Sequence, residues 1–269
     1  MERWVRLILQ LLNPMLIFKR LTPYLAAAAV ALLLIAGLQW PAAWWVIMLA
    51  LTVIPIMVVF VMRQPHWRIE YVGLSVPMIW LILGAYTFLL IQDQLLIIVA
   101  AIALATVFFF LFEKNLAVFL YTPNQYIPFS LEHISTYSTV LASFFVYTSL
   151  FTFSILRLAR LRYIFLAALL LTAAMVWQTF WIQKIAWAKA KWFVIVISAV
   201  LTEVAVALYY WPVSFFVTGI VLTLSLYVLL HLSRHHLTKT LTRQLLWRYL
   251  ATSSAALLLL LLTAQWNYI

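Results

Sequence analysis

The sequence predicts an all-α integral membrane protein, a polytopic bundle of about nine transmembrane helices. First, 68% of the 269 residues are hydrophobic and 9% are charged, whereas soluble domains are roughly half apolar and about a quarter charged. Second, apolar windows recur at the roughly 20 residues that a helix needs to cross a bilayer core. Third, only short polar turns separate these windows, which leaves no room for a second domain.

The apolar windows are bounded by recognisable turn signals. Thr22-Pro23 predicts a helix start, with Thr as N-cap and Pro at the first helical position. Trp40-Pro41 and Trp211-Pro212 predict tight turns at the membrane interface. The expected spans are residues 22–39, 42–62, 71–92, 94–112, 134–156, 163–183, 192–211, 213–232 and 247–266. Residues 113–133 leave the number of spans open, since 115–133 could form a further crossing or a re-entrant segment.

Residues 1–20 predict an amphipathic helix that lies in the cytoplasmic interface, ahead of a single transmembrane domain over residues 21–269. Arg3, Arg6, Gln10 and Asn13 recur at helical spacing, and Trp4, Leu7, Ile8, Leu11 and Leu12 fill the opposite face. An apolar face beside a basic polar face is typical of such interfacial helices. Pro14 is expected to end or kink the helix.

Lys and Arg set the expected orientation, because cytoplasmic loops are enriched in both. With the N-terminus in the cytoplasm, fourteen of the seventeen fall inside and three outside, namely Arg157, Arg160 and Arg162. The net charge of +11 then reflects contact with anionic lipid headgroups rather than with nucleic acid, for which no recognition motif is present. The absence of a signal-peptide pattern and of a glycosylation sequon fits the cell membrane of a prokaryote.

Glu203 is the first candidate for a functional residue. It lies within an apolar window, where a carboxylate costs several kcal/mol and usually faces the bundle interior. We expect it to be protonated, to meet a transported cation or to accept hydrogen bonds. Thr172 and Gln178 on the preceding span are the polar side chains expected nearest to its depth.

The irregular segment before the fifth span contains a second pair of candidates, Glu132 and His133. Polar loops often carry function. Adjacent residues diverge by about 100° on a helix, so the two act as an acid–base pair only on extended backbone. The same span is rich in Ser and Thr, which either allow close helix packing or line a hydrophilic pathway.

A basic cluster is predicted near the inner end of the eighth span, and its members are His231, Arg234, His235, His236, Lys239 and Arg243. The spacing H-x-x-x-H-H of its histidines resembles one histidine box of membrane di-iron desaturases and hydroxylases. That family needs more histidines than the five in this chain. We therefore expect a basic interface that attracts anionic lipid headgroups or a partner, with no metal site and no cofactor.

Three functions fit these observations. The favoured one is a membrane subunit, scaffold or assembly factor that acts through helix and lipid contacts, because no catalytic motif is found. An alternative is a proton- or cation-linked carrier or channel that uses Glu203. A second alternative is a membrane-embedded enzyme acting on lipid through Glu132, His133 or the histidine cluster.

Overall fold

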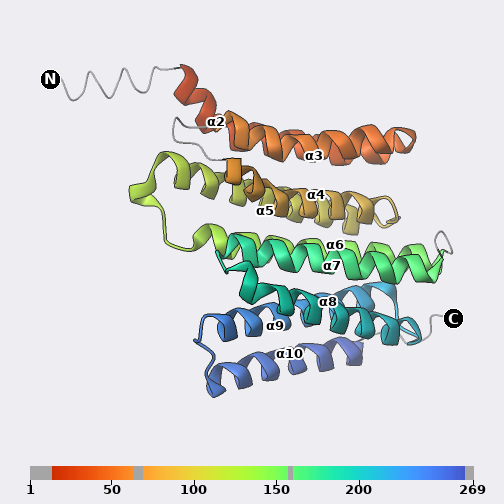
Figure 1. Ribbon diagram of the computed structural model, residues 1–269. Coiled ribbons are helices and arrows are strands. Elements are labelled where there is room, and N and C mark those ends of the chain that lie inside the picture. The colour runs from red at the N-terminus through yellow and green to blue at the C-terminus, as the bar shows by residue number, and fades with distance from the viewer. Residues whose placement is uncertain (1–13, 63–68, 157–159, 264–269) are drawn as a thin grey trace. The chain divides into compact units, whose positions relative to one another are not determined.

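The computed structural model describes residues 14–62, 69–156 and 160–263, which are almost entirely helical (Figure 1). Nine of the described helices are long and apolar enough to span a membrane, so the protein is a multi-pass membrane protein with an all-α bundle. Their bounds are α2 Pro14–Gln39, α3 Trp44–Val61, α4 Val76–Leu89, α5 Leu95–Tyr121, α6 Ser130–Ile155, α7 Leu161–Ile182, α8 Trp187–Tyr209, α9 Phe215–Leu237 and α10 Arg243–Thr263. Short 3₁₀ turns η1 (Pro41–Ala43), η2 (Ile69–Ser75) and η3 (Pro123–Gln125) join some of them.

The first described helix begins earlier than the sequence predicts. The expected start at Thr22-Pro23 is wrong, since α2 begins at Pro14 and runs without a break through Pro23 to Gln39. Pro14 is compatible with the first helical position, where its missing N–H costs nothing. Pro23 removes one intrahelical hydrogen bond, which membrane helices tolerate. Residues 1–13 of the predicted amphipathic helix lie outside the described residues.

Residues 113–133 do not form a further crossing. The helix predicted to end at residue 112 continues as α5 to Tyr121, η3 follows, and α6 begins at Ser130. The polar run Glu113-Lys114-Asn115 therefore lies inside a helix. Asn115 fits there because its amide nitrogen donates to the carbonyl of Leu111 at 2.8 Å, and the Ser130 hydroxyl donates to its side-chain oxygen at 3.2 Å.

The helices form two compact units, Met1–Ser135 and Thr136–Ile269. In the first unit, α2 packs on α3 and α5, and α4 packs on both α3 and α5. Gly37 of α2 lies directly against the ring of Tyr86 on α4, where a Cβ would have no room. The missing side chain therefore lets these two helices approach closely.

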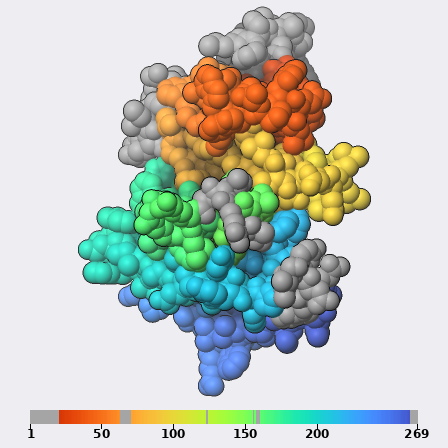
Figure 2. Space-filling model, turned by 90° about the vertical axis from the view of Figure 1, so that its right-hand side faces the viewer, coloured from red at the N-terminus to blue at the C-terminus, as the bar shows by residue number. Residues whose placement is uncertain are grey.

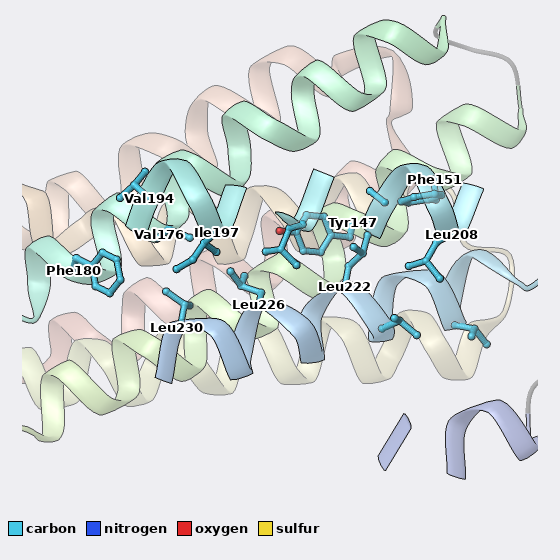
Figure 3. Close-up of a cluster of buried hydrophobic side chains, with 14 of the residues drawn as sticks. Tyr147, Phe151, Val176, Phe180, Val194, Ile197, Leu208, Leu222, Leu226 and Leu230 are labelled. Atoms are coloured by element: carbon cyan, nitrogen blue, oxygen red, sulfur yellow. The ribbon is translucent and has the colours of Figure 1, made fainter. Parts of the chain in front are cut away.

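The second unit is built around the part of α6 that follows Ser135. Its hydroxyls reach α7 through Tyr147–Thr172 at 2.7 Å and α9 through Ser143–Thr223 at 3.4 Å. A continuous apolar cluster that includes Tyr147 joins α6, α7, α8 and α9 (Figure 3), and Val176, Leu222 and Leu226 are fully buried in it. α6 is the most buried of the nine spans.

The last helix, α10, lies beside α9 at the edge of the second unit (Figure 1). Ser253 is the one buried residue of α10, at 8% exposure, and the blue atoms of this end of the chain lie on the surface in Figure 2. Leu257 and Leu260 are partly buried against the apolar cluster, whereas Leu262 is 80% exposed. Lipid or another chain must therefore cover most of α10.

Close packing of α6 on α9 depends on Gly219, since a Cβ there would meet Thr148. We expect Gly219→Val to destabilise the protein by about 1–3 kcal/mol through overpacking. The measurement is the temperature of unfolding in mild detergent. Adding Thr148→Gly should recover part of the loss, and Ala256→Leu on the exposed side of α10 is the matched control. An equal loss in the control would contradict the close-packing account.

Candidate functional site

Glu203 lies on the outer face of α8 rather than in the bundle interior. The interior face of α8 carries Val194, Ile197, Leu201 and Ala205, all buried. Glu203 is exposed, in line with Trp192 and Val196, which are 63% and 56% exposed. It forms no hydrogen bond or ion pair with the described residues. The carboxylate therefore interrupts an otherwise apolar surface stripe.

Thr172 and Gln178 are buried on α7 and do not meet Glu203. The Thr172 hydroxyl is hydrogen-bonded to Tyr147 on α6 at 2.7 Å. Gln178 is 3% exposed, and neither its amide nitrogen nor its oxygen has a hydrogen-bond partner. The expected proximity of these residues to Glu203 is therefore not found, because Glu203 lies on the exposed face of α8.

The hydroxyls of the spans are used mostly within their own helices. Ser149, Thr152 and Thr179 each donate to the carbonyl four residues earlier, at 2.7–2.9 Å. Ser143 donates to the carbonyl three residues earlier at 2.7 Å. A hydroxyl whose proton is bound to its own helix presents little polarity to a passing solute. This pattern supports close packing by small side chains over a hydrophilic pathway.

Glu132 and His133 both lie in the first turn of α6, so the extended backbone that would align them as an acid–base pair is absent. The Tyr126 hydroxyl donates to the Glu132 carboxylate at 3.2 Å and accepts the Leu131 N–H at the same distance. Burial raises the pKa of Tyr126, and the neighbouring Glu132 charge also raises it. These contacts tie the α5–α6 connection to the start of α6.

The basic cluster lies at the end of α9 and in the turn to α10. His231 is buried at 9% exposure, and its Nδ1 lies 2.9 Å from the Tyr227 carbonyl. His235 Nδ1 lies 2.8 Å from the Thr240 hydroxyl. The Tyr249 ring of α10 lies within 5.6 Å of His231 and 6.1 Å of His235, centroid to centroid. The remaining members of the cluster are Arg234, His236, Lys239 and Arg243.

These histidines do not form a metal site with the residues around them. Within the described ranges, no three His, Cys, Asp or Glu side chains come together as ligands could. One ring nitrogen each of His231 and His235 faces a protein oxygen in a local hydrogen bond. The arrangement is that of an interhelical aromatic stack rather than a ligand shell.

Glu113 is the buried carboxylate that sequence reasoning missed. It is fully buried on α5, and neither carboxylate oxygen has a hydrogen-bond partner. Thr106, two turns earlier on α5, also has a buried hydroxyl without a partner. The adjacent Lys114 made Glu113 look like part of a solvated turn. Glu113 lies inside the helix because α5 continues to Tyr121. The apolar run 116–121 is the sequence signal for that continuation.

Comparison with known proteins yields a family but no characterised relative. No curated protein and no solved structure matches the chain. A family model described as "Protein of unknown function (DUF5656)" matches residues 37–263, which include every described helix from α3 to α10. Because the match covers most of the 269 residues, the chain belongs to the DUF5656 family.

Proposed function

We propose that the protein is a membrane subunit or assembly factor that acts through helix contacts, and that the exposed face of α8 is its contact surface. The observation that carries this proposal is the exposed carboxylate of Glu203 on an otherwise apolar stripe. The partner is a transmembrane helix of a different protein, which presents a cation or a hydrogen-bond donor to Glu203.

The depth of Glu203 supports this proposal. It lies six residues before Tyr209, the last residue of α8, or about 9 Å along the axis at 1.5 Å per residue. The exposed residues that follow α8, Tyr210 and Trp211, are typical of a membrane interface. Glu203 therefore lies on the hydrocarbon side of that interface, where an unpartnered carboxylate costs several kcal/mol.

Among the described residues of the second unit, no cation pairs with this carboxylate. The neighbouring helix α7 begins at Leu161 with Arg162 as its second residue. Phe165 of α7 packs on Tyr209 with ring centroids 6.1 Å apart, so Arg162 lies beyond the end of α8 from Glu203. Its guanidinium donates to the Tyr163 hydroxyl at 3.1 Å. The complementary group must come from another chain.

Crosslinking from α8 tests this proposal. The chain has no Cys, so a single Cys at the exposed Ala199 can carry a photoreactive maleimide in native membranes. We expect an adduct with one other membrane protein, and mass spectrometry should place the link in a helix that carries a Lys, Arg, Asn, Gln, Ser or Thr. Glu203→Leu should reduce the adduct about tenfold, since interhelical polar contacts are worth about 1–2 kcal/mol.

The matched control is a Cys at Ala205, which is 1% exposed on the opposite face of the same helix. It should give no adduct. An adduct of Ala199→Cys that survives Glu203→Leu unchanged would exclude a role for the carboxylate. A product with the mass of two copies of this chain would replace the partner by a second copy and overturn the proposal.

A second candidate function, proton-linked transport, is favoured by Glu113 rather than by Glu203. Glu113 is fully buried in the first unit and without a hydrogen-bond partner. An ionised carboxylate is costly in such a site, so the neutral acid is the form that fits. A group of this kind suits a proton that is bound and released as the helices move.

Proton flux separates this candidate from the subunit function. In liposomes with a potassium potential set by valinomycin, the wild type should acidify the lumen faster than protein-free liposomes do, as read by an entrapped pH dye. Glu113→Gln should abolish the difference because the amide cannot release a proton. Glu203→Gln is the matched control and should leave the flux unchanged. Flux equal to that of protein-free liposomes in the wild type would exclude the candidate.

A further inference from the structure

One end of the second unit carries a dense positive charge with no acidic residue in the unit to balance it. Glu203 is the only Asp or Glu between residues 136 and 269, and it lies near the Tyr209 end of α8. The opposite end of the unit holds seven Lys and Arg residues in and around two connections, Lys184, Lys189, Lys191, Arg234, Lys239, Arg243 and Arg248. Residues 136–269 supply no carboxylate at this end to offset their repulsion, and Glu132, one turn before Thr136 on α6, accepts a hydrogen bond from Tyr126.

The α9–α10 turn brings three of these cations together. The N–H groups of Thr240 and Leu241 both donate to the carbonyl of His235, at 2.9 and 3.1 Å. Lys239 has a positive φ of 58°, which reverses the chain. The tight reversal holds Lys239 between Arg234, in the last turn of α9, and Arg243, the first residue of α10.

The start of α8 lies next to this turn. Phe193 of α8 packs on His236 of α9 with ring centroids 5.7 Å apart. Lys189 and Lys191 lie in the first turns of α8, before Phe193. The Lys191 ammonium is 5.5 Å from the ring of Trp192. Lys189 lies four residues before Phe193 and so on the same face of α8, toward the turn cations, whereas Lys191 lies on the outward side beside Trp192.

The level of this region in the membrane identifies the anion. Trp187, Trp192 and Trp247 all lie at this end of their helices, and each is more than half exposed. Tryptophan gathers at the level of the lipid headgroups. An anion at that level, beside transmembrane helices, is the phosphate of a phospholipid.

We infer that the α9–α10 turn and the start of α8 bind the headgroup of an anionic phospholipid. The headgroup phosphate bridges Arg243 of α10 and Lys239 of the turn, with Lys189 of α8 on its far side. Because α10 has so little buried surface, such a bridge also holds it against α9. This inference requires only that the protein lies in a membrane, and it does not depend on the partner proposed for α8.

Native mass spectrometry of the full-length protein tests the inference. The protein is delipidated in detergent and offered phosphatidylglycerol or phosphatidylcholine at equal concentration. We expect the wild type to retain phosphatidylglycerol selectively. Lys239→Gln with Arg243→Gln should weaken that binding about 30-fold, because each cation near an anionic headgroup contributes about a fivefold gain in affinity. The charge-retaining pair Lys239→Arg with Arg243→Lys should keep it.

The matched control removes two cations at the opposite end of the unit, Arg160→Gln with Arg162→Gln, and should bind phosphatidylglycerol as the wild type does. An equal loss of phosphatidylglycerol binding in both double variants would indicate a general effect of net charge and would overturn the proposed site. If millimolar inorganic phosphate displaces the lipid, the site binds free phosphate rather than a lipid headgroup, and the inference is overturned. If the Gln pair fails to fold, loss of wild-type selectivity in high salt supports the inference, and unchanged binding of both lipids overturns it.

Discussion

The structure depends on the absence of water around its helices. In hydrocarbon an unpaired N–H or C=O group costs several kcal/mol, so the chain satisfies its backbone within continuous helices and turns sharply between them. The same constraint extends to the side chains. Hydroxyls such as those of Ser149 and Thr179 donate hydrogen bonds to backbone carbonyls of their own helix. Once polar groups are satisfied locally, helices associate by shape, and Gly219 against Thr148 sets how near α6 and α9 come.

Most of the fold could be predicted from the sequence, because span length and turn residues follow directly from bilayer thickness. Local rules failed where two of them competed. Thr22-Pro23 has the pattern of a helix start, yet Pro14 provides one earlier and α2 continues through Pro23. Glu113-Lys114 has the pattern of a turn, yet the apolar run after it continues α5. The sequence also does not reveal which way Glu203 faces. That direction depends on which face of α8 packs on α7 and α9, and this face cannot be identified because apolar residues occur on all sides of α8.

The second unit has cations at both ends, with Arg160 and Arg162 at the start of α7, but a single carboxylate. Its carboxylate lies near the Tyr209 end of α8 and faces outward, while Lys239 and Arg243 lie at the end where α9 gives way to α10. Neither Glu203 nor the two cations form an ion pair with the described residues of the unit. Our proposals assign a neighbouring helix to the carboxylate and the headgroup layer to the cations.

The shallow attachment of α10 bears on how the protein is made. Membrane proteins emerge from the ribosome with their N-terminal helices first, and the apolar cluster of the second unit draws its buried members from α6 to α9 and the α8–α9 turn. That cluster is complete before α10 has been synthesised. α10 therefore adds Leu257 and Leu260 to the edge of a cluster whose buried residues all precede it in the chain. Changes in α10 are consequently separated from the folding of the rest, which leaves this helix free to diverge in sequence at little cost to the bundle.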